Sequence, residues 1–177
     1  MPTYVSMLRG INVSGQKRVM MGDLRRSYDS LGFQDARTYV QSGNVVFRHP
    51  GSDALKVGGE IERGLKRSFG FDVLVFVRTR DELQDLVENT PFSGKDESKL
   101  HVTFLSERPA GFPVEEMRRI KEKEEEFSAR AREVYLLCPN GYGKTKLSNN
   151  FFERKLKVSA TTRNWRTVNA LLSMANE

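Results

Sequence analysis

The sequence predicts an α+β protein made of two small sheets covered by helices. Short β-rich segments alternate with segments whose apolar residues recur at helical spacing, and residues 1–80 show this alternation in the order β-α-β-β-α-β. This is the order of a ferredoxin-like unit, or α-β plait, in which antiparallel strands lie in the spatial order 4-1-3-2. The pattern of residues 81–177 predicts a second, modified plait-like unit with two C-terminal helices. We therefore expect domains at 1–80 and 81–177, either separate or merged into one compact domain.

The first half of the first unit is predicted from apolar spacing and turn residues. Thr3–Arg9 is β-rich and forms the first strand. A helix follows and ends near Gly32, because its apolar residues recur at helical spacing. These residues are Met21, Leu24, Tyr28 and Leu31. Arg37–Gln41 and Asn44–Arg48 are β-rich and separated by Ser42-Gly43, which indicates a hairpin.

The second half of this unit is a helix and a buried strand. Ser52 or Asp53 suits the helix N-cap, and Gly70 suits its C-terminal stop. The apolar side of this helix carries Leu55, Ile61, Leu65 and Phe69. Asp72–Arg78 then contains a continuous apolar run, which is typical of a strand buried on both faces.

The second half of the chain is less regular. Strands are expected at Leu100–Leu105 and Glu133–Cys138, and Thr90–Lys99 is expected to be a linker because it combines Pro, Gly and several charges. Helices are expected at Asp81–Glu88, Pro113–Phe127, Leu147–Val158 and Thr162–Ala175. In the last helix, Trp165 shares one side with apolar residues and is predicted to be a packing anchor, with Thr161 or Thr162 as the N-cap.

Three polar loops rich in Gly and Asn follow or join predicted strands. They are Arg9–Asn12, Gln41–Asn44 and Pro139–Lys146, and a basic stretch at 161–167 follows the last one. None of them contains a carboxylate. In a plait, the first strand ends at the same end of the sheet as the turn between the second and third strands. We therefore expect Arg9–Asn12 and Gln41–Asn44 to be neighbours in space.

Positive charge is concentrated in the two parts of the chain that carry these loops. Residues 1–20 hold three basic residues and no acidic one, and residues 139–177 hold seven basic and two acidic. Such a field favours phosphate-bearing partners, including nucleic acid, and Arg and Asn side chains suit phosphates and base edges. The candidate ligand-binding residues are Arg9, Asn12, Gln41, Asn44, Asn140, Lys144, Lys146, Arg163, Asn164 and Arg166. The alternative is that these Asn and Gly residues only form turns.

Two established phosphate- and RNA-binding patterns are incomplete. Gly141-Tyr142-Gly143-Lys144-Thr145 lies between a strand and a helix, as a P-loop does. The glycine that would help wrap the phosphates is replaced by Cys138, and Pro139 has no N–H to offer. Weaker anion contact at the following helix start stays open. Ser42–Phe47 lacks the basic and aromatic pattern of an RNA-recognition strand, so RNA binding by base stacking on that sheet is not expected.

The sequence is poor in catalytic and metal-binding groups. His49 and His101 lie away from the loop motifs, and Cys138 is expected to be a buried strand residue. No spacing suggests zinc, and loops without carboxylates do not suit metal-assisted phosphoryl transfer. We expect no metal and no cofactor. The acidic run Glu122–Glu126 is interpreted as a solvated helix face.

The single cysteine and the N-terminus indicate where the protein functions. One cysteine excludes an internal disulfide and suits a reducing cytosol. Residues 1–5 show no basic region followed by an apolar run, so we expect neither a signal peptide nor a membrane span. The predicted location is cytoplasmic, and the oligomeric state is left open.

Several sequence blocks resemble a known family. They are Leu8–Val13, Tyr39–Phe47, Pro139–Gly141, Lys146-Leu147 and Ala160–Trp165. These blocks are similar to those of the family of small bacterial proteins called domain of unknown function 1697. The resemblance covers nearly the whole chain and implies a pair of ferredoxin-like units. It implies no activity, substrate or catalytic residue, but its blocks coincide with the polar loops.

These observations leave three hypotheses. The first is a protein that binds a phosphate-bearing ligand, a nucleotide or RNA, through the basic loops. The second is an enzyme acting on a small anionic substrate, with Arg9, Asn12, Asn44 and Lys144 providing electrostatic stabilisation. A concave pocket joining the loops would favour a small substrate over nucleic acid. The third is a structural or protein-interaction role, in which Asn12, Asn44 and Asn164 each bond the backbone of another segment and face no cavity.

Overall fold

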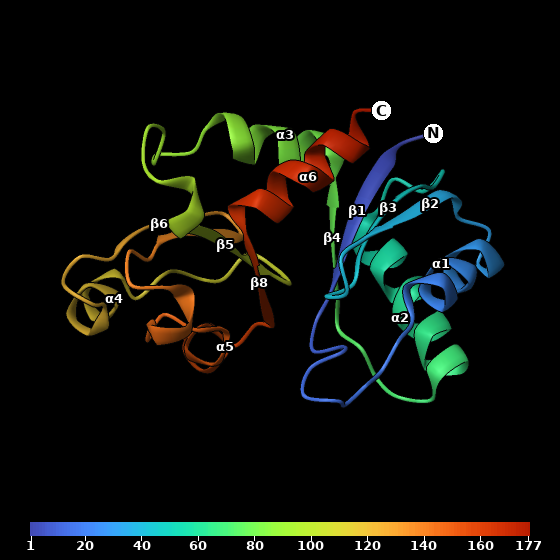
Figure 1. Cartoon of the computed structure of the whole chain (residues 1–177), viewed down its shortest axis with the longest axis horizontal. Helices are drawn as coiled ribbons and strands as arrows, with labels where there is room; N and C mark the ends of the chain where they lie inside the picture. Colours follow the sequence, from blue (N-terminus) through green and yellow to red (C-terminus); the bar gives the residue numbers. More distant parts are fainter. The chain divides into compact units, whose positions relative to one another are not determined.

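The computed structural model describes all 177 residues and divides into two compact units (Figure 1). Unit 1 comprises Met1–Glu88 together with Asn169–Glu177, and unit 2 comprises Asn89–Val168. The boundary between Glu88 and Asn89 lies directly before Thr90–Lys99, the segment expected to be a linker. The last residues of the chain belong to unit 1, because the C-terminal helix begins in one unit and ends in the other.

Unit 1 has the predicted plait topology. Its elements are β1 (Thr3–Leu8), α1 (Met21–Ser30), β2 (Gln34–Tyr39), β3 (Asn44–Arg48), α2 (Ala54–Phe69), β4 (Val75–Thr79) and α3 (Arg80–Glu88). The four strands form an antiparallel sheet in the order β2-β3-β1-β4, which confirms the predicted order. Asp53 caps α2 with its carboxylate, and Gly70 ends it with a left-handed backbone, as predicted.

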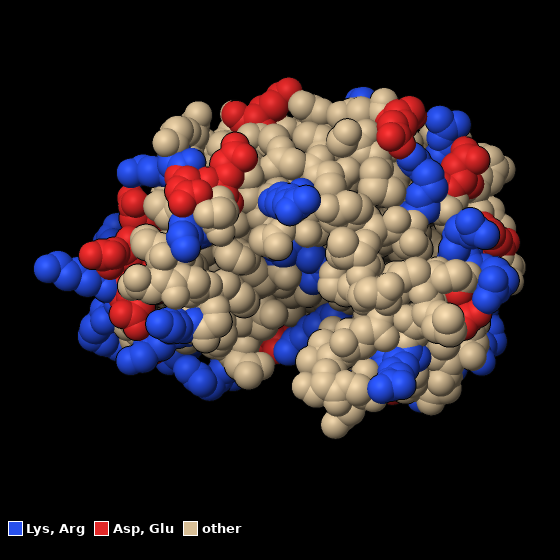
Figure 2. All heavy atoms as spheres, in the orientation of Figure 1, with Lys and Arg blue, Asp and Glu red and all other residues tan.

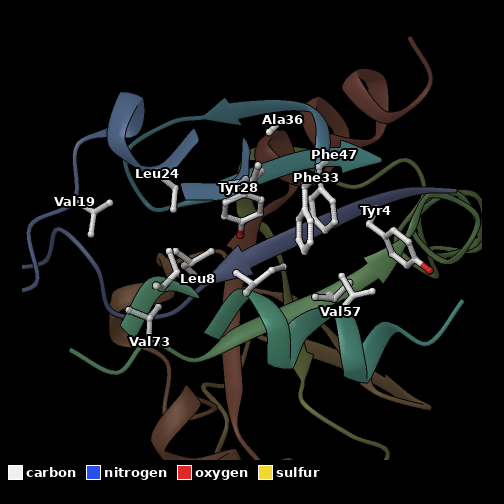
Figure 3. Close-up of a cluster of buried hydrophobic side chains, with 14 of the residues drawn as sticks. Tyr4, Leu8, Val19, Leu24, Tyr28, Phe33, Ala36, Phe47, Val57 and Val73 are labelled. Carbon is white, nitrogen blue, oxygen red and sulfur yellow. The ribbon is translucent and has the colours of Figure 1, made fainter. Parts of the chain in front are cut away.

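The core of unit 1 lies between one face of this sheet and helices α1 and α2. Tyr28 of α1 packs its ring edge against Phe33 and Phe47, whose centroids are 5.7 and 5.5 Å away. Figure 3 shows these rings at the centre of the cluster and Val19, from the loop before α1, at one end of it. Val19 is only 3% exposed, so the core extends into the loop that follows β1.

The other face of the same sheet is also buried. Val5, Met7, Val46 and Phe76 are each at most 2% exposed. Arg37 donates from its guanidinium to the carbonyl of Met174, 2.7 Å away, and pairs with Glu177. These contacts hold the end of the C-terminal helix beside β2. Burial on both faces explains the long apolar run around β4.

Unit 2 is the predicted second plait-like unit, and it contains all six elements of the order β-α-β-β-α-β. Its elements are β5 (Leu100–Leu105), α4 (Val114–Ile120), β6 (Glu126–Arg130), β7 (Glu133–Leu137), α5 (Asn149–Leu156), β8 (Ala160–Asn164) and the first residues of α6 (Trp165–Ala175). The antiparallel sheet has the order β6-β7-β5-β8, which repeats the arrangement of unit 1. None of the helices of the protein combines the length and the apolar character needed to cross a membrane.

The helix predicted at Pro113–Phe127 was wrong in its second half. Helix α4 ends at Ile120, and β6 begins at Glu126. The acidic run is not a solvated helix face, because Glu125 is 3% exposed. Its carboxylate accepts from the backbone N–H of Glu122 at 3.0 Å and from the Thr145 hydroxyl at 3.1 Å. A buried carboxylate with these donors forms a tight turn instead of a further helical turn.

The helix predicted from Thr162 also begins too early. Residues 160–164 form β8, which pairs with β5. Neither Thr161 nor Thr162 is the cap; the side-chain oxygen of Asn164 accepts from the N–H of Thr167 at 2.8 Å and caps α6. Trp165 is 4% exposed and its ring lies 6.5 Å from that of Tyr135, which confirms that it is a packing anchor.

Candidate functional site

The first two polar loops are neighbours in unit 1, as the plait topology predicted. The backbone N–H of Leu8 donates to the carbonyl of Gly43 at 2.8 Å. The side-chain amide of Asn12 donates to the carbonyl of Gln41 at 2.8 Å. The loop after β1 and the turn between β2 and β3 are therefore joined by both backbone and side-chain hydrogen bonds.

The loop after β1 folds into a small hairpin. The backbone N–H of Gln16 donates to Val13, and that of Asn12 donates to Lys17, at 2.9 and 3.1 Å. Ser14 and Gly15 between them both have positive φ, 52° and 74°, which is the signature of a type I′ turn. The hairpin projects from the end of the sheet and carries Arg18 on its returning side.

Asn12 holds this hairpin in place. Its amide nitrogen donates to the carbonyl of Val19 at 2.9 Å, and its amide oxygen accepts from the N–H of Val19 at 2.8 Å. With the bond to Gln41, both amide hydrogens of Asn12 are used. Asn12 therefore links the two loops by hydrogen bonds to their backbone. The structural hypothesis expected such bonds but also expected Asn12 to face no cavity, whereas Asn12 lines the pocket described below.

Gly43 allows the two loops to approach each other. A Cβ at this position would lie 2.6 Å from Cδ1 of Ile11 and 3.0 Å from Cβ of Leu8, and φ is +84°. Only glycine fits this conformation and this contact without displacement. The Ser42-Gly43 signal in the sequence therefore reflects both a turn and a close contact.

A pocket opens beside these two loops, and we call it the unit 1 pocket. Its volume is about 500 Å³, and it is lined by Asn12, Gly15, Arg18, Val19, Met20, Asp23, Gln41 and Phe69. The guanidinium of Arg18 and the side-chain amide of Gln41 are exposed and form no hydrogen bond or ion pair within the protein. The carboxylate of Asp23 pairs with Arg26. The pocket thus offers polar donors beside an apolar wall.

The candidate residues of the first two loops have different surroundings. Gln41 and Asn12 line the unit 1 pocket, whereas Asn44 is completely buried and donates to the carbonyl of Tyr39 at 2.9 Å. Asn44 is therefore engaged within the fold. Arg9 is half-buried and its backbone N–H donates to Leu74 at 3.0 Å. Arg18 is not among the residues predicted from the sequence, although it belongs to the basic N-terminal segment and follows the Ser14-Gly15 turn.

The third loop lies at one end of the sheet in unit 2 and is not a P-loop. Tyr142–Lys144 form a single 3₁₀ turn, and Tyr142 stacks on His101 with centroids 4.9 Å apart. The hydroxyl of Tyr142 donates to Thr162 at 3.0 Å, which anchors the loop to β8. Asn140, Lys144 and Lys146 are exposed, and neither lysine forms an ion pair.

A carboxylate lies beneath this loop although the loop contains none. Glu125 accepts from Thr145, and its negative charge lies near the Cys138 thiol. Burial, followed by the charge and hydrogen bond of Glu125, raises the pKa of Cys138 to about 12. The thiol is therefore protonated at neutral pH, which opposes a nucleophilic role. No three His, Cys, Asp or Glu residues lie together in a way that suits a metal ion.

The basic stretch after the third loop is divided between buried and exposed groups. Arg163 is 8% exposed, and its guanidinium donates to the Thr161 hydroxyl at 2.9 Å and the Thr162 carbonyl at 3.1 Å. Burial lowers the pKa of Arg163 to about 10, so it remains charged at neutral pH. Asn164 caps α6, and Arg166 is exposed without an ion pair.

Surface charge outside the loops is mixed. On the face drawn in Figure 2, Lys and Arg side chains gather over the part of unit 2 that holds α4 and α5, with acidic side chains between them. In α4, Arg118 pairs with Glu115, and Lys155 of α5 reaches Glu116 at 3.0 Å. The charges of these helices are partly neutralised by one another, unlike those of Lys144, Lys146 and Arg166.

The fold and the loops define a class of α+β protein with two successive plaits and polar loops at the ends of the sheets. The family model described as protein of unknown function (DUF1697) matches residues 1–135, and the chain belongs to this family. A comparison with curated proteins gives no match. A solved structure, the conserved bacterial protein SP0830 from Streptococcus pneumoniae, is similar over 100% of this chain and 99% of its own, with 22% sequence identity and a TM-score of 0.71. At this identity the likeness shows the shared fold.

Proposed function

We propose that the protein binds a small phosphate-bearing molecule, of the nucleotide class, in the unit 1 pocket. The observation that carries the proposal is that this pocket joins the first two loops and presents Arg18 and Gln41 with their polar groups unused. A cavity of about 500 Å³ is within the range of small-molecule sites. A concave site favours a small ligand over an extended RNA strand.

The residues that line the pocket suit both the phosphate and the base of a nucleotide. The Arg18 guanidinium can donate two parallel hydrogen bonds to phosphate oxygens, which is the strongest neutral-pH contact that the pocket offers. Gln41 carries both a donor and an acceptor and can bond the edge of a base. Val19, Met20 and Phe69 form the apolar side, where a planar ring would be partly desolvated.

Binding of RNA is the second candidate function, and a separate group of residues favours it. Three exposed cations of unit 2 form no ion pair: Lys144, Lys146 and Arg166. The third loop itself contains no acidic residue. Such cations interact with a phosphate backbone in a manner that weakens steeply with salt. This candidate predicts affinity for short RNA that exceeds the affinity for mononucleotides.

The test is a calorimetric or fluorescence titration with a set of nucleoside mono- and triphosphates and with a short RNA, at two salt concentrations. Arg18→Ala should weaken nucleotide binding about 10- to 100-fold, because a charged hydrogen bond contributes roughly 1.5–3 kcal/mol. Arg63→Ala is the matched control, since Arg63 is exposed in α2 and outside the pocket. Lys144→Ala should leave nucleotide binding unchanged and weaken RNA binding.

The proposal fails if no nucleotide binds at low salt, or if Arg18→Ala and Gln41→Ala bind as tightly as the natural protein. Strong RNA binding that is lost with Lys144→Ala and insensitive to Arg18→Ala would establish the second candidate instead.

A further inference from the structure

The two units share the same strand order and have corresponding hydrogen bonds in the loops at the end of each sheet. In unit 1, the N–H of Leu8 bonds the β2–β3 turn at Gly43, 2.8 Å away, and the N–H of Arg9 bonds Leu74 before β4 at 3.0 Å. In unit 2, Leu105 and Ser106 make the corresponding bonds, to Arg132 in the β6–β7 turn at 2.8 Å and to Ser159 before β8 at 2.9 Å. The segment after β5 therefore corresponds to the hairpin after β1.

A second pocket opens at this corresponding end of the sheet, and we call it the unit 2 pocket. Its volume is about 410 Å³. It is lined by the loop after β5 and by the β6–β7 turn, just as the unit 1 pocket is lined by the loop after β1 and the β2–β3 turn. The lining residues are Arg108, Pro109, Ala110, Gly111, Phe112, Ala129, Arg130 and Ala131.

The charge of the lining distinguishes this pocket from three other cavities of the protein. Three other cavities of the protein, including the unit 1 pocket, each contain Asp23, Asp35, Asp81 or Glu177, whereas the unit 2 pocket contains two arginines and no carboxylate. Arg108 is exposed and forms no ion pair. Ala129 packs with Phe112 in the core beneath the pocket, and strand alternation puts the Arg130 side chain on the other face of β6, where its guanidinium lies 6.0 Å from the centre of the Tyr135 ring. The guanidinium assigned to the pocket is therefore that of Arg108.

The backbone of the loop adds donors. The N–H groups of Ala110 and Gly111 make no hydrogen bond within the protein. Gly111 has no atom within 4 Å of the position that a Cβ would occupy, so a ligand can approach the chain closely there. Pro109 is buried and Phe112 half-buried, and they supply an apolar floor. Guanidinium and amide donors around a shallow apolar site are suited to an oxyanion with three or more acceptor oxygens.

We propose that the unit 2 pocket is a second phosphate-binding site, in which the Arg108 guanidinium and the backbone N–H groups of Ala110 and Gly111 hold a phosphate group against the loop after β5. This site uses none of the residues assigned to the nucleotide in unit 1. It goes beyond the proposed function because it predicts two phosphate groups bound per chain, at equivalent ends of the two plaits.

The test is a ¹H–¹⁵N NMR titration of the full chain with inorganic phosphate, against sodium chloride of equal ionic strength. Saturable shifts are expected for the amides of Ala110, Gly111 and Ala131. Arg108→Ala should weaken phosphate binding, as reported by these amides, at least tenfold. Arg108→Lys should cause a smaller loss of affinity, because lysine keeps the positive charge but cannot donate the two parallel hydrogen bonds of a guanidinium. Arg118→Ala is the matched control, since Arg118 is an exposed arginine of the same unit outside the pocket.

The outcomes separate this inference from the proposed function. Gly15 and Gln41 report the unit 1 pocket, and their response is read independently. If Ala110, Gly111 and Ala131 do not shift, shift equally in chloride, or shift unchanged in Arg108→Ala, the second site is overturned whatever unit 1 does. If they respond while Gly15 and Gln41 do not, the second site stands without support for a phosphate in unit 1.

Discussion

Replacing Asn12 with alanine should loosen the loop that forms the unit 1 pocket. The change removes three hydrogen bonds, two to Val19 and one to Gln41, with lengths of 2.8–2.9 Å. At about 1 kcal/mol for each partly buried bond, and less for the exposed one to Gln41, the loss is roughly 2 kcal/mol. Alanine in the left-handed conformation of Asn12, φ 56°, adds about 1 kcal/mol. The expected total is about 3 kcal/mol.

The assay combines urea unfolding with hydrogen exchange of the Val19 amide. This N–H donates directly to the side-chain oxygen of Asn12, so it reports the loop itself. A local loss of about 3 kcal/mol corresponds to roughly 100-fold faster exchange. Asn12→Gly permits the positive φ and isolates the hydrogen bonds, whereas Asn12→Asp keeps the acceptor for Val19 and loses both donors.

Asn140→Ala is the control, because Asn140 is an exposed loop asparagine whose side chain makes no hydrogen bond in the protein. It should change the free energy of unfolding by less than about 0.5 kcal/mol. The reasoning is refuted if Asn12→Ala unfolds at the same urea concentration as the natural protein and its Val19 amide exchanges at the same rate.

Three further predictions concern packing and protonation. Gly43→Ala should destabilise unit 1 by about 2–4 kcal/mol in urea unfolding, because the new Cβ would lie 2.6 Å from Cδ1 of Ile11. Gly143→Ala is the control and should be close to neutral, because no atom lies within 4 Å of its Cβ position. Equal urea midpoints for the two variants would contradict the prediction. Burial lowers the pKa of His101 from 6.5, so at acidic pH the folded state binds fewer protons than the unfolded state, and the free energy of unfolding should fall as pH drops below 6.5. His101→Gln should remove the part of this fall that His101 causes. An NMR titration that gives a pKa of 6.5 or higher for His101 would contradict the prediction. The pKa of Cys138 is raised to about 12, so its thiol should resist iodoacetamide at pH 8 until urea unfolds the protein, and rapid alkylation of the native protein would contradict this. Because the unfolded thiol ionises first, the contribution of Cys138 to the free energy of unfolding should decline as pH rises from 9 towards 12.

The first plait was predictable because its signals are local. Apolar spacing marks α1 and α2, Asp53 and Gly70 mark the ends of α2, and Ser42-Gly43 marks the hairpin between β2 and β3. Once this order of elements is known, the plait topology places the loop after β1 beside the β2–β3 turn. The adjacency of Asn12 and Gln41 therefore followed from short-range patterns and from the rules of strand connection.

The second plait was harder because two of its strands are polar. A helix was predicted to begin at Thr162. Instead, Ala160–Asn164 pairs with β5 as a strand, and the hydroxyl groups of Thr162 and Thr103 are hydrogen-bonded at 2.8 Å. Strand formation by such residues depends on the partner strand rather than on their own propensity. Glu125 is a similar case, since its buried carboxylate accepts both from the nearby N–H of Glu122 and from Thr145, twenty positions later in the chain.

The amino-acid order by itself was sufficient for the plait class, the order of elements in unit 1, the capping of α2 and the neighbouring position of two polar loops. Whether each polar group is free to bind a ligand was decided by contacts with residues distant in the sequence. Asn12 and Asn44 look alike in sequence, but the fold gives one three bonds at the rim of a pocket and buries the other completely. Arg18 and Arg108 became candidates only through the cavities beside them. Residue type sets which bonds a side chain can make, whereas burial and distant partners set which of those bonds remain unused.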